Sequence, residues 1–160
     1  MAVDYFLKID GVPGESADVK HKGEIQLESF SWGESSPGGA GPGGGGGAGK
    51  VQMQDLLVTM LVSKASPRLM LACASGKHYK EAVLTARRAG KAQQEFLVFK
   101  LKDVTVTSYQ TAGAAGGEAP VDQASLGFST IQLEYRPQKG DGSLDTPVKA
   151  GWDVKQNKPV

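Results

Sequence analysis

The glycine-rich stretch Gly44 to Lys50 is the first place in this chain where the residue types suggest chemistry. It reads GGGGAGK and satisfies the first seven positions of a phosphate-binding loop. The eighth position should be a hydroxyl that contacts magnesium, but Val51 stands there. Such a loop also follows an apolar strand and opens a helix, whereas polar residues precede this one and a strand-like pattern follows it. The sequence therefore favours a flexible contact loop over nucleotide binding.

The other reactive side chains are isolated from one another along the chain. His21 lies between Lys20 and Lys22, which disfavours cation binding and indicates a solvated surface. His78 follows a predicted helix, where capping or packing is expected, and Cys73 lies on the apolar stripe of that helix. The carboxylates form no evident acid and base pair. We therefore predict no catalytic residues, no metal site and no cofactor, and do not expect an enzyme.

The charge balance gives no general reason to expect nucleic acid or an anionic membrane as a partner. The 160 residues carry 18 Lys plus Arg against 17 Asp plus Glu. A basic cluster around the end of the predicted helix is better explained as a solvated strand face; it comprises Lys77, Lys80, Arg87, Arg88 and Lys91. The charged N-terminal residues do not fit a cleaved export signal, and the apolar run from Leu56 to Val62 is too short for a membrane helix. We expect a protein made in the cytoplasm.

One helix is predicted, from Ser66 to Gly76. Ser66 is expected to cap its start, with Pro67 at the first helical position, and Gly76 marks its end. Leu69, Ala72 and Cys73 form a narrow apolar stripe at helical spacing, suited to packing on a sheet or closing the end of a barrel.

The remainder of the chain alternates with the period of β-strands. Predicted strands cover 3–9, 24–32, 51–62, 78–87, 95–111, 121–135 and 148–154. In 24–32 the apolar residues change parity, so either both faces are covered or a bulge near Ser29 shifts the register. In 95–111 one side should carry Leu97, Phe99, Leu101, Val104, Val106 and Ser108. About eight strands and one helix, with no βαβ alternation, predict a single mainly β domain (α+β) over 1–160. Its expected architecture is an antiparallel barrel or sandwich.

Four separated blocks of the sequence resemble one known family. They are VDYFLKIDGVPGES, GGGGGAGKVQMQDL, LACASGKHYKEAVLTARRAG and PQKGDGSLDTPVKAGWDVKQN. In this order they resemble the Hcp (haemolysin-coregulated protein) family, which forms the inner tube of the bacterial type VI secretion system. The resemblance implies a β-barrel similar to phage tail tube proteins and a homohexameric ring with an open lumen. It also implies that stacked rings are expelled by a contracting sheath together with a spike, and that small effectors are carried in the lumen. A monomeric secreted barrel that binds ligands is the alternative.

The resemblance also suggests particular contact residues. Ser31 is the candidate for a lumen-facing effector contact. An equally simple interpretation places Phe30 and Trp32 in the barrel core with Ser31 merely opposite them. The loop from Gly38 to Lys50 resembles the family's extended loop, which contacts neighbouring subunits and stacked rings; its candidate residues are Gly38, Pro42, Gly47, Gly49 and Lys50. The alternative for this loop is an unattached, disordered segment.

Overall fold

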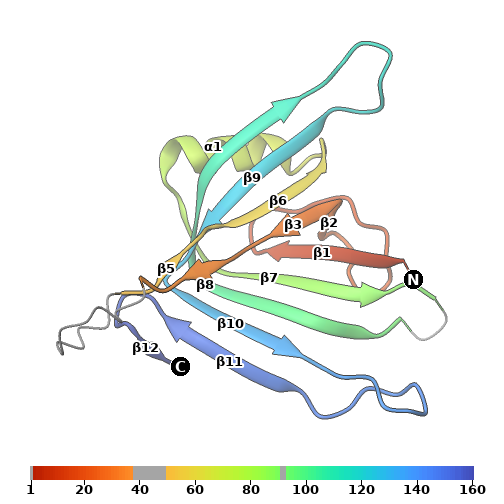
Figure 1. Cartoon of the computed structure of the whole chain (residues 1–160). Helices are drawn as coiled ribbons and strands as arrows, with labels where there is room; N and C mark the ends of the chain where they lie inside the picture. Colours follow the sequence, from red (N-terminus) through yellow and green to blue (C-terminus); the bar gives the residue numbers. More distant parts are fainter. Residues whose placement is uncertain (1, 38–49, 91–92) are drawn as a thin grey trace.

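A computed structural model describes residues 2–37, 50–90 and 93–160 of the chain (Figure 1). In chain order its elements are β1 (Val3–Ile9), β2 (Ile25–Leu27), β3 (Ser29–Ser31), β4 (Glu34–Ser35), β5 (Gln52–Met53), β6 (Leu56–Leu61), α1 (Ser66–Ser75), β7 (His78–Arg88), β8 (Glu95–Ala112), β9 (Val121–Gly127), β10 (Thr130–Tyr135), β11 (Val148–Asp153) and β12 (Lys158–Pro159).

The strand pairings are antiparallel and close a circuit. The main path of the large sheet runs β12, β11, β10, β8, β7, β1 and β2. Strand β2 continues into β3, which pairs with β6; β6 pairs with β9, and β9 returns to the C-terminal part of β8. These pairings make a barrel, from which β10, β11 and β12 extend as a sheet on the N-terminal part of β8. An antiparallel barrel with a single helix among the described residues confirms the predicted fold class.

The structure has more strands than expected because several predicted strands change partner. The predicted strand 24–32 breaks at Glu28, whose backbone N–H donates to the carbonyl of Thr59 at 2.8 Å, so that β2 pairs with β1 and β3 with β6. This break next to Ser29 agrees with the predicted change of register. The segment 51–62 divides into β5 and β6, and 121–135 divides into β9 and β10. Strands β4 and β12 were not predicted.

Strand β8 serves two parts of the barrel. Its first part pairs with β7 and β10, and its last part pairs with β9. The register shifts between Val106 and Ser108, which makes Thr107 an extra residue in this strand. The prediction that Ser108 lies on the same side as Val106 was therefore wrong: Val106 is buried and Ser108 is exposed.

Helix α1 ends as predicted but begins differently. Gly76 adopts a left-handed conformation (φ 69°), and its N–H donates to the carbonyl of Ala72 at 3.0 Å. The predicted Ser66 cap was wrong, because Ala65 occupies the cap position and has no side-chain hydrogen bond there. The Ser66 hydroxyl instead accepts from the N–H of Ser63 at 3.0 Å and donates to the buried carboxylate of Asp122. This contact ties the start of the helix to β9.

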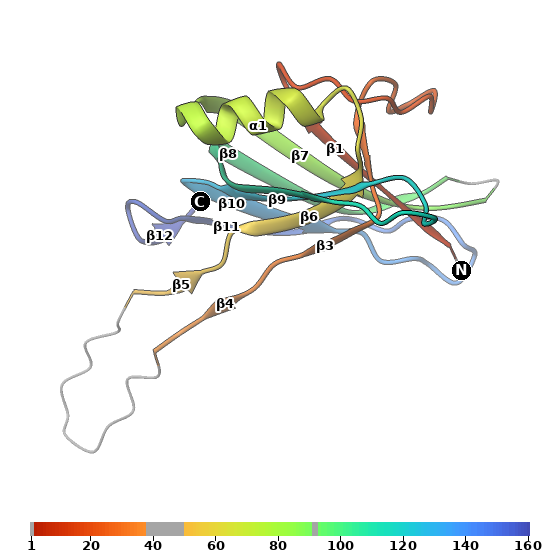
Figure 2. The same ribbon diagram turned by 90° about the horizontal axis from the view of Figure 1, so that it is seen from above.

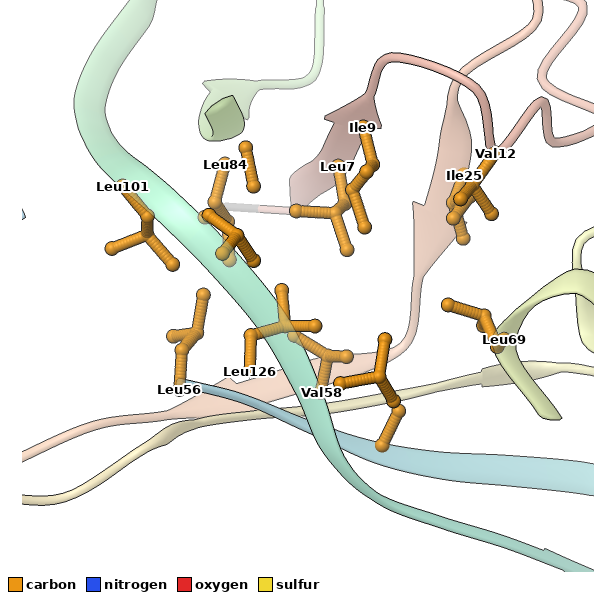
Figure 3. Packing of buried hydrophobic residues seen from close by; sticks show 14 of the residues in the cluster. Leu7, Ile9, Val12, Ile25, Leu56, Val58, Leu69, Leu84, Leu101 and Leu126 are labelled. Carbon is orange, nitrogen blue, oxygen red and sulfur yellow. The ribbon is translucent and has the colours of Figure 1, made fainter. Parts of the chain in front are cut away.

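A continuous apolar core fills the barrel beneath the helix (Figure 3). Leu7, Leu84 and Leu101 project into it from β1, β7 and β8, while Leu56, Val58 and Leu126 come from β6 and β9. Leu69 of α1 lies at its edge near Val12 and Ile25. Full burial of one such side chain contributes roughly 1.5–3 kcal/mol. The core therefore holds both sides of the barrel and the helix together.

The polar segment 13–24 packs on the barrel, which corrects two expectations. His21 was expected on a solvated surface, but it is only 7 % exposed, and its ring stacks on Phe6 of β1 with centroids 4.3 Å apart. Arg87 was expected on a solvated strand face, but it is 3 % exposed and makes a two-pronged ion pair with Asp18 at 2.6 and 2.9 Å. Asp18 raises the pKa of the Arg87 guanidinium through this hydrogen bond, and Arg87 holds the pKa of the Asp18 carboxyl well below its usual range.

Candidate functional site

The outer side of strands β3, β6, β9 and the end of β8 carries uncharged side chains, all of them polar except Leu57. We call this surface the neutral face; it consists of Ser29, Ser31, Leu57, Thr59, Ser108, Gln110, Gln123 and Ser125. Two rows run across the strands. In one, Ser31 lies opposite Leu57, then Ser125, then Ser108; in the other, Ser29 lies opposite Thr59, then Gln123, then Gln110. Figure 1 shows these strands on the side of the barrel away from β10 and β11.

Hydrogen bonds between hydroxyl groups order part of the neutral face. The hydroxyls of Ser29 and Thr59 are bonded across β3 and β6, and those of Ser108 and Ser125 across β8 and β9. The bulged Thr107 donates to the carboxylate of Asp55 at 2.6 Å. The face is therefore a surface of fixed hydroxyl groups, each with further capacity to donate or accept.

The alternate residues of the same strands form the underside of this face. Phe30 packs edge-on against Tyr5 and Phe99, with ring centroids 5.2 and 5.6 Å apart. Trp32 also packs on Phe99, at 6.1 Å. Ser31 is exposed on the opposite side. Both interpretations of Ser31 given above require this arrangement, so its role as a lumen contact stays a prediction.

Two edges of this sheet are open within a single chain. In the part of the chain that the structure describes, β3 pairs with β6 alone, and residues 107–112 of β8 pair with β9 alone. Neither edge carries a charged side chain: the first reads Ser29-Phe30-Ser31, and 107–112 reads TSYQTA. Charged or proline residues commonly protect exposed edges from pairing with another chain, as Lys158 and Pro159 do on β12. These two unprotected edges are thus suited to strand pairing between copies.

A different surface covers β1, β7, the start of β8, β10 and β11. We call it the charged face; its charged members are Lys8, Glu81, Lys100, Lys102, Glu134 and Lys149. Glu81 lies opposite Lys102, and Glu134 lies opposite Lys149 with 3.8 Å between the carboxylate and ammonium groups. Opposite charges therefore neighbour one another on this face, which is typical of a surface in contact with water.

The glycine-rich loop lies mostly outside the described residues. Gly38, Pro42, Gly47 and Gly49 fall there, whereas Lys50 is described and exposed. The strands on either side, β4 and β5, pair with each other and extend away from the barrel (Figure 2). At the root of this ribbon, an apolar groove of 370 Å³ lies between the ribbon and the β10–β11 sheet; Trp32, Met53, Leu133 and Trp152 are among its lining residues.

The reactive side chains singled out in the sequence make separate contacts in the described residues. No cluster of three or more His, Cys, Asp or Glu there could hold a metal ion. His78 is exposed, with its Nδ1 2.9 Å from a carboxylate oxygen of Asp103, and Cys73 is half-buried against the core. Hydrogen bonds from Ser129, and then from His78 and Lys155, hold the pKa of Asp103 well below its usual range. Within the described ranges, no helix is long and apolar enough to cross a membrane.

Comparisons with known proteins give one consistent result. Residues 6–135 match the family model for the type VI secretion system effector Hcp. The chain is 49 % identical to Protein hcp1 of Pseudomonas aeruginosa PAO1 over 159 residues, which is 98 % of both proteins. A solved structure of a type six secretion system protein superposes with a TM-score of 0.93 at 31 % identity, covering 99 % of this chain and 100 % of the other. Hcp1 from Salmonella typhimurium superposes with a TM-score of 0.81 at 36 % identity over the full length of both.

Proposed function

The chain belongs to the Hcp family and is a secreted tube protein of the type VI secretion system, and from this premise we propose how it assembles and what it carries. Copies join into a homohexameric ring in the cytoplasm, and rings stack into a tube inside the sheath. Contraction of the sheath expels this tube with the spike, and small effectors travel in its lumen. The open, uncharged edges of β3 and of the end of β8 are the observation that carries this proposal.

The two open edges support a ring whose interfaces are all equivalent. If β3 of one copy lies beside residues 107–112 of the next, each copy uses two different edges, and the contact is head-to-tail. Such contacts form a closed ring when a whole number of the rotations that relate neighbouring copies makes a full turn. The family resemblance implies six copies in the ring. Pairing of these edges satisfies the backbone groups that a single chain leaves open.

In this ring the neutral face lines the lumen. The sheets of neighbouring copies become one continuous surface, so the hydroxyl and amide groups of the neutral face surround the channel. The Asp55 carboxylate bonded to Thr107 borders this wall, but the members of the neutral face carry no charge, so they can hold a cargo through hydrogen bonds rather than by charge. Ser31 is the proposed effector contact on this wall, because it is exposed and lies next to the open edge.

The loop from Gly38 to Lys50 contacts neighbouring subunits and stacked rings in this proposal. The direction of the β4–β5 ribbon supports it, because the ribbon carries both ends of the loop away from its own barrel. Deletion of Gly38 to Gly47 is expected to weaken ring assembly and stacking while the subunit still unfolds in a single cooperative thermal transition. Loss of that cooperativity would show that the loop serves folding instead.

Engineered disulfides test the head-to-tail contact. In a Cys73→Ser background, one cysteine replaces Ser29 or Ser31 on β3, and a second replaces Ser108 or Gln110 on β8. Directly paired residues lie about 4.5–5.5 Å apart between Cα atoms, which a disulfide can span. Oxidation of the correct pair should give a ladder of cross-linked species that stops at six copies. Variants with only one of the two cysteines are the controls and should not form the ladder. If none of the double-cysteine variants gives cross-linked products larger than a dimer, the proposed ring is contradicted.

A further inference from the structure

The His21 side chain has a negatively charged partner at each ring nitrogen. Nδ1 lies 2.9 and 3.0 Å from the two carboxylate oxygens of Glu24, and Nε2 lies 2.6 Å from a carboxylate oxygen of Glu95 on β8. The ring is closed off from water on one side by its stacking on Phe6. One imidazole thus joins segment 13–24, through Glu24, to the barrel, through Glu95.

This arrangement needs a proton on both ring nitrogens. A neutral imidazole donates from one nitrogen and presents a lone pair at the other, and a carboxylate has only lone pairs to offer. With a neutral ring, one of the two contacts would bring two acceptors together at hydrogen-bond distance. The imidazolium form donates at both nitrogens and satisfies Glu24 and Glu95 together, with hydrogen bonds strengthened by charge.

Other charged groups surround this contact. They are Asp4 on β1, Asp18, Lys20 and Lys22 in the segment, and Arg87 on β7. The Arg87–Asp18 pair is a second ionic tie between segment and barrel, and the backbone N–H of His21 itself donates to Asp18 at 3.2 Å. Because a guanidinium does not lose its proton in proteins, this second tie does not depend on pH near neutrality.

We propose that His21 is a protonation-sensitive latch that fastens segment 13–24 to the barrel in its imidazolium form. Loss of the ring proton breaks the contact with either Glu24 or Glu95 and leaves the segment held by Arg87 and Asp18. Opening of the segment exposes its own backbone bonds to water, among them Gly14 N–H to Gly23 O at 2.8 Å and Ser16 N–H to Glu24 O at 3.0 Å, so the protection of these amides reports the state of the latch. All groups of the latch belong to one chain, so it does not rest on the proposed ring.

The latch stabilises the docked segment while the ring carries a proton on both nitrogens, and it loses this contribution when one of these protons leaves at higher pH. A hydrogen bond to a charged group is worth enough to change an opening equilibrium roughly tenfold or more. Backbone amide protection in segment 13–24 should therefore fall about tenfold or more between pH 6 and pH 8.5. Protection is calculated relative to the intrinsic exchange rate at each pH, so that the chemistry of exchange itself cancels.

Hydrogen exchange on the full-length protein tests the latch with two variants. In Glu95→Gln the carboxamide can accept from a ring N–H or donate to a ring lone pair, so protection of the segment should become nearly independent of pH. In His78→Gln, which removes the other histidine of the chain and its contact with Asp103, the pH dependence of the segment should equal that of the parent. Equal protection of the parent at both pH values, or an unchanged pH dependence in Glu95→Gln, would overturn the proposal.

Nitrogen NMR of the imidazoles tests the protonation state directly. At pH 6 both ring nitrogens of His21 should give protonated signals. A neutral tautomer at that pH would place the shared proton on a carboxyl group and would equally overturn the latch.

Discussion

The neutral face and the charged face enclose the same core but offer opposite surfaces to their surroundings. Beneath both, alternate residues such as Leu126 and Leu84 are fully buried. Above them, one face has hydroxyl and amide groups beside open, uncharged strand edges, and the other has lysines and glutamates, some of them in pairs of opposite charge. Burial therefore explains the fold of both sides equally, and only the outward residues distinguish the charged face from the surface that we propose lines the lumen of a ring.

The largest effect on stability is expected in the buried core, which lies beneath both faces. Leu126→Ala and Leu84→Ala each remove a fully buried side chain, from the underside of the neutral and of the charged face respectively. Each should lower the free energy of unfolding by about 2–5 kcal/mol, because a cavity remains. Denaturant unfolding of the separated subunits measures this cost. A loss confined to one of the two variants would mean that the barrel does not have one shared core.

Acid should destabilise the fold by protonating two carboxylates, Asp18 and Asp103, that are not part of the neutral face. The pKa values of Asp18 and Asp103 lie below those of an unfolded chain, so both carboxylates stabilise the fold above about pH 4 and lose this contribution as the pH falls further. We expect the thermal midpoint to drop from pH 5 to pH 3 and to drop less in Asp103→Asn. Ser125→Ala on the neutral face is the control and should keep the slope of the parent; an unaltered slope in Asp103→Asn would contradict the assignment.

The smallest effect on stability is expected from substitutions that change the surface charge of each face. These substitutions should nevertheless differ in how well the protein retains an effector. Ser31→Arg adds a charge to the neutral face, and Lys100→Ser removes one from the charged face. Both should change the free energy of unfolding by less than about 1 kcal/mol, because both sites are at the surface. Ser31→Arg should still form rings but retain a small type VI effector less well in a pull-down assay, whereas Lys100→Ser should retain it like the parent. Equal retention by Ser31→Arg would remove Ser31 from the proposed lumen contact.

The sequence predicted what depends on neighbouring residues in the chain. Strand periodicity, the stop at Gly76 and the change of register near Ser29 all follow from local pattern. Ser66 was misjudged because its partner, Asp122, comes from a strand far along the chain, and the pairing of β6 with β9 brings the two regions together. His21 was misjudged for a similar reason: Glu24, three residues away, was visible as a partner, but Glu95 was not.

The neutral face shows the same limit. Its members are ordinary polar residues in sequence, and they become a surface only through the register of β3, β6, β9 and β8. The bulge at Thr107 has no evident local signal, yet it turns Ser108 outward and completes the row that begins at Ser31. The family resemblance identified Ser31 as a candidate, but the pattern of its own strand did not distinguish it from any other exposed serine.

Native mass spectrometry of the purified protein, with electron microscopy of the same sample, tests the proposed ring most directly. The predicted result is a particle of six times the 16.8 kDa subunit mass, seen as rings with an open centre. A clean monomer across the micromolar concentration range would contradict the ring and favour a monomeric secreted binding module.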